Sequence, residues 1–179
     1  MNRDKGPDFS MRIRLSDVGR GPVSHRLAPD EAQRARIAAE LDLAGLPAFV
    51  GEVKVFPWHD GAEIQGRWTA TVTYVCGVSL DTFDAEMTGE FDIRAVPPSS
   101  PLASAPEPDE QGEIELDLDA DDPPDVLDGE TLDLAAYLVE DLALDLDPFP
   151  RKPGAVFEAP PPENPESPFA VLKRLEPKK

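Results

Sequence analysis

Four stretches in the first 96 residues alternate apolar and polar residues, the two-residue period of a β-strand that buries one of its faces. They are residues 9–15, 49–55, 64–75 and 83–96. Asp60-Gly61, between the second and third stretches, is a dipeptide typical of hairpin turns, and a short connection through Cys76 joins the third to the fourth. We therefore expect a meander of antiparallel strands with one dry face and one wet face.

The first helical segment follows a clear start signal. Pro29, Asp30 and Glu31 combine a proline near the helix start with acids that favour the first turn. Alanines together with isoleucine and leucine then supply an inward face. These residues predict a helix over 32–43 that ends at Gly45.

The second helical segment spans residues 132–146, where leucines recur every four positions. Asp133 is expected to cap its first turn, and Asp147-Pro148 to end it. Together with the strand pattern, the two helices predict an α+β fold: a small antiparallel β-sheet or meander covered by two helices.

Proline marks the expected boundaries of the domain. Of the 21 prolines, seven fall within residues 97–124 and nine within 148–179. We expect a flexible N-terminus over 1–8, a single domain over 9–154 with a mobile, proline-rich acidic loop over 97–112, and a disordered proline-rich tail over 155–179. Residues 113–119 alternate acids and apolar residues, which fits either an edge strand or an acidic extended arm.

Charge is strongly segregated along the chain. The formal net charge is −19, yet residues 1–36 hold eight bases against five acids, while residues 80–149 hold 22 acids and one base. Such a surface repels a phosphate backbone at long range, so any RNA contact has to be local. The candidates for that contact, or for contact with another partner, lie in the basic head; the alternative is that they pair internally with the acidic middle. They are Arg12, Arg14, Arg20 and Arg26.

The residues that could perform catalysis form no recognisable constellation. Cys76 is the only cysteine, so no intrachain disulfide can form, and a location in the reducing cytoplasm is favoured. His25 and His59 are far apart in sequence, and no serine-nucleophile, zinc-protease or phosphate-loop motif occurs. We therefore expect no catalytic residue, no metal and no cofactor. A nuclease or hydrolase that uses paired carboxylates with Mg²⁺ is an alternative, although no spacing singles out such a pair. No apolar run is long enough to span a membrane, so we expect no membrane partner.

The order of several pieces resembles the YceD family, whose members are linked to accumulation of the large-subunit ribosomal RNA in bacteria and plastids. The pieces are the end of the first strand at 15–19, the cysteine-centred turn at 76–83, the acidic stretch 114–118, the helix 132–144 and its end at 147–150. The resemblance covers residues 9 to 154. The positions that match the family's motifs are Cys76, Leu80, Phe83, Asp133, Leu134 and Pro148.

The resemblance implies a protein that is not an enzyme. Its implied role is in synthesis, processing or stability of 23S rRNA, with a ribosomal protein or a pre-50S assembly intermediate as partner and 23S rRNA as a further one. The alternative is an acidic adaptor or chaperone for basic proteins that has no link to rRNA.

This chain departs from the family at its cysteines. Many relatives have C-x-x-C at the central turn and further cysteines after the C-terminal helix. Here Cys76 keeps the first position, Ser79 stands at the second, and residues 150–153 contain no cysteine. We therefore expect no metal at this turn, and expect that packing of Leu80 and Phe83 holds it instead.

Overall fold

The computed structural model describes residues 9–103 and 122–157. Its elements follow one another in the order β1 (Arg12–Arg14), α1 (Leu15–Val18), β2 (Val23–Leu27), α2 (Glu31–Glu40), β3 (Gly45–Trp58), β4 (Gly61–Val75), β5 (Thr82–Val96), the 3₁₀ turn η1 (Pro101–Ala103), β6 (Asp125–Val126), β7 (Thr131–Asp133) and α3 (Leu134–Asp145). None of the described helices is long and apolar enough to cross a membrane.

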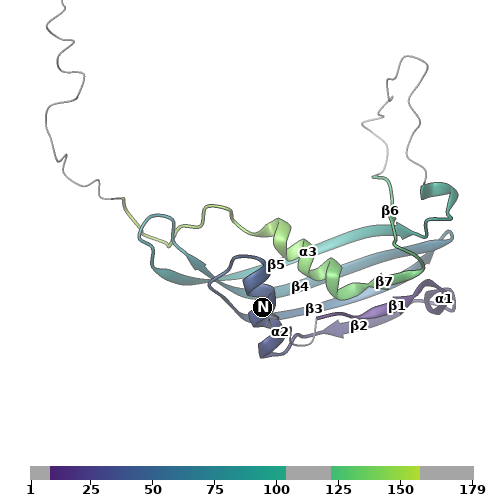
Figure 1. Ribbon diagram of the computed structural model, residues 1–179, viewed down its shortest axis with the longest axis horizontal. Helices are drawn as coiled ribbons and strands as arrows, with labels where there is room; N and C mark the ends of the chain where they lie inside the picture. Colours follow the sequence, from purple (N-terminus) through teal and green to yellow (C-terminus); the bar gives the residue numbers. More distant parts are fainter. Residues whose placement is uncertain (1–8, 104–121, 158–179) are drawn as a thin grey trace, which may run out of the picture.

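One five-stranded sheet organises the molecule, with the strand order β2-β3-β4-β5-β6 (Figure 1). Strands β2 to β5 are antiparallel neighbours, whereas β6 runs parallel to β5. A separate ribbon joins β1 to β7. The α+β class is confirmed, but the expectation of a wholly antiparallel sheet is wrong: the sheet is mixed, because the chain leaves β5 and returns to the same edge through β6.

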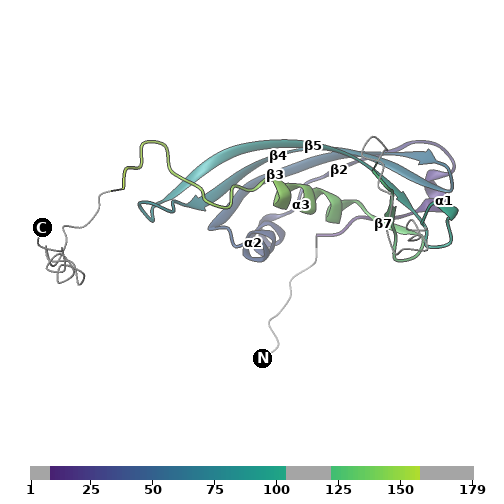
Figure 2. The ribbon, with the colours of Figure 1, turned by 90° about the horizontal axis from the view of Figure 1, so that it is seen from above.

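The helices cover only one face of this sheet. Seen from above, β3, β4 and β5 form an arch, and α2, α3 and β7 all lie on the same side of it (Figure 2). Alternate residues of β4 are buried on that side, among them Ile64, Trp68 and Val72. They meet the buried leucines of α3, and the Trp68 indole Nε1 donates a hydrogen bond of 2.6 Å to Asp141 on that helix. The predicted division into a dry and a wet face is thus present.

Two glycines allow the close approaches that this packing needs. A Cβ atom on Gly89 would lie 2.5 Å from a ring carbon of Trp68, and a Cβ on Gly61 would collide with the backbone of Ala95. Because real Cβ atoms do not approach other atoms so closely, both positions favour glycine for steric reasons. Gly89 makes room for the largest buried side chain on β4.

The N-terminal prediction is only partly right. The strand expected over residues 9–15 is limited to β1, because Leu15 begins the single turn of α1, which buries Val18. Strand β2 was not predicted, although Val23, His25 and Leu27 alternate with exposed residues. With only five residues, three of them polar, β2 has a weak sequence signal and depends on its pairing with β3.

Both helices begin and end close to their predicted positions. Asp30 caps α2 in a reciprocal capping box with Gln33, as its start signal indicates. The helix ends at Glu40 and not at Gly45, because Asp42 adopts a left-handed backbone conformation (φ 55°) and Gly45 already begins β3. Helix α3 begins at Leu134, since Leu132 belongs to β7, and Asp133 is its cap as predicted.

The first part of the expected mobile loop is structured. Ser100 is buried, its hydroxyl donates a hydrogen bond of 2.9 Å to Asp60 in the β3–β4 turn, and it accepts one from the Leu102 amide at 3.1 Å. These contacts attach residues 100–102 to the β3–β4 turn. Residues 1–8, 104–112, the acidic stretch 113–119 and the tail from 158 onward lie outside the described residues.

Candidate functional site

The connection between β4 and β5 forms a tight turn around Cys76. The Cys76 amide donates to the Asp81 carbonyl at 2.8 Å, and the Leu80 amide donates to the Cys76 carbonyl at 2.9 Å. These two bonds return the chain into β5 in register with β4, so that Val75 pairs with Thr82. The turn stands at the end of the longest hairpin in the molecule.

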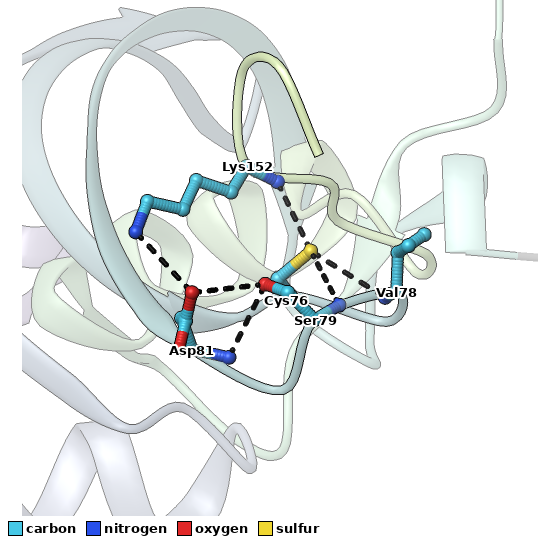
Figure 3. A network of polar contacts seen from close by, with 5 residues as sticks. All are labelled: Cys76, Val78, Ser79, Asp81 and Lys152. Carbon is cyan, nitrogen blue, oxygen red and sulfur yellow. Dashed lines mark hydrogen bonds and ion pairs between the residues drawn. The ribbon is translucent and has the colours of Figure 1, made fainter. Parts of the chain in front are cut away.

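The Cys76 thiol sits inside this turn and gathers backbone donors (Figure 3). The amides of Val78 and Ser79 both donate to Sγ at 3.4 Å, and the amide of Lys152 donates at 3.3 Å. The thiol has 0% exposure to solvent. One sulfur atom therefore joins its own turn to a segment 76 residues further along the chain.

The segment after α3 is held against the turn by two further contacts. The Gly77 amide donates to the Pro150 carbonyl at 2.9 Å, and the Lys152 ammonium lies 3.4 Å from a carboxylate oxygen of Asp81. The Ser79 hydroxyl donates to the same carboxylate oxygen at 3.2 Å. The β4–β5 turn and the segment after α3 thus meet in space, held together by amides and an ion pair.

These donors stabilise the ionised form of the sulfur. The pKa of Cys76 is lowered from 9.0 to about 6, with the nearby Ser79 side chain as the largest cause, followed by the amides of Ser79 and Lys152, against the opposing effect of burial. A thiolate is a stronger hydrogen-bond acceptor than a thiol. Ionisation of Cys76 and closure of the turn therefore favour each other.

The prediction that packing of Leu80 helps to hold this turn is wrong. Leu80 is 76% exposed and adopts a left-handed backbone conformation (φ 63°), so it contributes no packing. Phe83 does pack against the core, with its ring centroid 5.8 Å from that of Tyr74. Pro148 lies exposed in the connection that follows α3. The sequence analysis did not predict the ion pair between Asp81 and Lys152. The only signals for it in the sequence were an acid in the turn and a base in the later segment.

Asp133 forms a second junction, between the N-terminal segment and α3. Its carboxylate accepts hydrogen bonds from the Ser10 hydroxyl at 2.6 Å, the Met11 amide at 2.9 Å and the Ala135 amide at 3.2 Å. Burial raises its pKa, but these hydrogen bonds outweigh burial, and the net effect is a pKa below the ordinary value of 3.8. Leu134 beside it is fully buried and donates its amide to the Met11 carbonyl. Asp133 and Leu134 therefore both stabilise the fold.

The four candidate arginines come from two strands of different sheets and from one turn. Arg12 and Arg14 are exposed on the same side of β1, and the Arg12 guanidinium lies 3.6 Å from Asp133. Arg20 is exposed in the turn after α1, and Arg26 is exposed on β2, which belongs to the other sheet. Arg12 therefore follows the alternative of internal pairing, whereas Arg14, Arg20 and Arg26 are exposed.

The open face of the large sheet contains charges of both signs. The Arg67 guanidinium on β4 donates to Glu52 on β3, and this hydrogen bond with its ionic attraction lowers the pKa of Glu52 and raises that of Arg67. The pair borders a hollow of about 560 Å³ that is also lined by Lys54, Glu90 and Asp92. Because acids and bases alternate across the strands here, the hollow selects neither anions nor cations.

No group of three or more histidine, cysteine or acidic side chains that could hold a metal ion occurs in residues 9–103 and 122–157. His25 on β2 and His59 in the β3–β4 turn do not come together with Cys76 as ligands. Comparison with protein-family models, with curated proteins and with solved structures found no match for this chain.

Proposed function

We propose that this protein is a non-catalytic factor that supports synthesis, processing or stability of 23S rRNA during assembly of the large ribosomal subunit. It acts in the cytoplasm by binding. Its acidic surface engages a basic ribosomal protein or a pre-50S intermediate, and its exposed arginines contact RNA locally. The proposal follows the resemblance to the YceD family.

One observation carries this proposal: the Cys76 turn and the segment after α3 lie together. The resemblance places the relatives' cysteines at these two sites, and such cysteines could act on one group only if the sites were neighbours. Here the Lys152 amide lies 3.3 Å from the Cys76 sulfur although 76 residues separate them. A pattern of sequence positions that is loose by itself thus coincides with a specific contact in three dimensions.

The distribution of arginines supports a local RNA contact. Arg14, Arg20 and Arg26 are exposed, and guanidinium groups bind phosphate oxygens well. With a net charge of −19, the chain cannot rely on long-range attraction to RNA. The main partner is therefore a protein with a basic surface, and RNA contact is an addition to it.

Deletion of the gene tests the proposal. We expect the ratio of large-subunit to small-subunit rRNA to fall, free small subunits to accumulate in gradient profiles, and expression of the intact chain to reverse both. Unchanged rRNA ratios and unchanged profiles would contradict the proposal. Crosslinking in cells, with identification of the bound RNA and protein, shows which partner is direct.

A second candidate function is an acidic adaptor or chaperone for basic proteins in general. It is favoured by the exposed acids along β5, namely Asp84, Glu86, Glu90 and Asp92, which require no ribosomal partner. Capture from lysate at low salt separates the two functions. Ribosomal proteins and precursor subunits support the first, whereas a diverse set of basic proteins supports the second.

A further inference from the structure

Strand β5 has an open edge. It pairs with β4 from Thr82 to Ala95, but on its other side only Ala95 and Val96 are paired, with β6. Within residues 9–103 and 122–157, no strand pairs with that side of residues 82–94 (Figure 1). Such an edge presents unpaired backbone N–H and C=O groups and is a template for a further strand.

One hydrogen bond shows which residues face this edge. The Leu127 amide donates to the Val96 carbonyl at 2.9 Å, so the backbone polar groups of Val96 point away from β4. Successive residues of a strand point these groups to alternate sides, and the β4–β5 register contains no bulge. The even-numbered residues of β5 therefore direct their N–H and C=O groups to the open edge.

The side chains beside the edge form two rows of different chemistry. From Thr82 to Asp92 the even-numbered residues are exposed on the wet face and include four acids, whereas the odd-numbered residues from Phe83 to Ile93 are half-buried and apolar. The acidic row consists of Asp84, Glu86, Glu90 and Asp92, and the apolar row includes Phe83, Ala85, Met87 and Phe91. The carboxylates of Asp84 and Glu86 accept hydrogen bonds from Thr73 and Thr71 on β4, which hold them over the sheet.

We propose that the open edge of β5 binds an extended segment of a partner protein in which basic and apolar residues alternate. Backbone hydrogen bonds would provide affinity, the bases would face the acidic row, and the apolar residues would continue the half-buried row. The inference rests on the protein-binding part of the proposed function and names the chemistry of the partner segment.

The charge of the edge argues against the other occupants. A second copy of β5 would place acids opposite acids, an arrangement that disfavours edge-to-edge pairing. The chain's own alternating stretch 113–119 has acids at every polar position and no base. A segment in which basic and apolar residues alternate is complementary to both the acidic row and the apolar row of the edge.

The test uses the full chain and a fluorescent peptide of about eight residues in which lysine and valine alternate. We expect it to bind, and a glutamate–valine peptide to bind at least about tenfold more weakly. Methylation of the lysine amides should also weaken binding at least about tenfold if pairing is antiparallel, while methylation of the valine amides should not. Parallel pairing reverses this preference. Equal binding of both methylated peptides would overturn the inference, because it would indicate charge attraction without strand pairing.

Protein variants address the same edge from the other side. Thr88→Pro removes an N–H group aimed at the edge without removing a β4–β5 hydrogen bond, so binding should weaken about three- to tenfold, whereas Thr88→Val should leave it unchanged. Glu86→Lys with Glu90→Lys should weaken binding at least about tenfold. Glu31→Lys with Glu40→Lys on α2 is the matched control, since it changes the net charge equally away from β5.

Three results would overturn the inference: an equal loss in the α2 control, a dimer in sedimentation that the peptide dissociates, or β5 edge amides that exchange slowly before peptide is added. The last result would mean that the edge is already covered by the chain itself. Circular dichroism of each variant establishes that it is folded. If the peptide does not bind but deletion of the gene lowers rRNA, the binding edge is refuted and the proposed function stands. If the peptide binds but deletion leaves rRNA unchanged, the proposed function is refuted and the binding edge stands.

Discussion

Two junctions tie distant parts of this chain together, one at Asp133 and one at Cys76, and in both a single acidic side chain accepts three hydrogen bonds. At Asp133 the acceptor is a carboxylate with bonds of 2.6 to 3.2 Å, set between the N-terminal segment and α3. At Cys76 the acceptor is sulfur, with longer contacts of 3.3 to 3.4 Å, at the far end of the β4–β5 hairpin.

The difference concerns what each junction supports. Leu134, next to Asp133, is buried in the main core, so loss of that junction exposes apolar surface. The Cys76 junction holds the segment at 150–152, which is not an element of the core, and ionisation of the thiol favours its closure. We therefore expect the Asp133 junction to determine global stability and the Cys76 junction to open locally.

The largest effect is expected for Asp133→Ala. The change removes the α3 cap and leaves the Ser10 hydroxyl and the Met11 amide without their acceptor. Loss of charge-assisted hydrogen bonds and of a cap should lower the free energy of unfolding by about 2–4 kcal/mol, measured by urea denaturation. Asp133→Asn keeps an acceptor oxygen and should lose less than half as much; an alanine variant as stable as the parent would contradict this role.

Acidification gives the same junction a second test. Because its pKa is lowered on folding, ionised Asp133 stabilises the folded state above its ordinary pKa of 3.8, and this contribution disappears as the pH falls through the folded value. The difference in stability between the parent and Asp133→Ala should therefore shrink below about pH 4.

An effect of intermediate size on stability is expected at Cys76, and it should depend on pH in a higher range than the effect of Asp133. Since the folded pKa is about 6 and the ordinary value is 9.0, stability from this group should rise with pH between those values and be lost as the pH falls below about 6. The ultraviolet absorbance of the thiolate should have its midpoint near 6. In Cys76→Ala, hydrogen exchange of the Gly77 and Lys152 amides should accelerate while the core amides stay protected; an absorbance midpoint near 9 would contradict the ionised junction.

The smallest effect is expected for Lys152→Ala, which removes the ion pair with Asp81. Both side chains are about half exposed, and exposed ion pairs contribute little. We expect a loss of at most about 1 kcal/mol, which salt should abolish. Because the Lys152 amide, and not its side chain, contacts the sulfur, the thiolate absorbance should change little; a large shift would mean that the ammonium group dominates the junction.

Local patterns in the sequence accounted for the long strands, the capping of both helices and the single dry face of the sheet. Alternation over 64–75 and 83–96 is a property of adjacent residues, and the capping of α2 by Asp30 and of α3 by Asp133 involves neighbours within three positions. Such features are readable because the residues that interact are close in the chain.

Tertiary structure decided the rest. The pairing of β1 with β7, the brief strand β2, the mixed sheet and the contact of Lys152 with Cys76 all join residues whose local sequence carries weak or no signal. Leu80 shows the same limit, because its apolar character indicated packing and only the backbone of the turn directs it to solvent. Sequence determined which segments could be strands, helices and caps, whereas only the folded chain could bring a single thiol and three amides from two distant segments to one point.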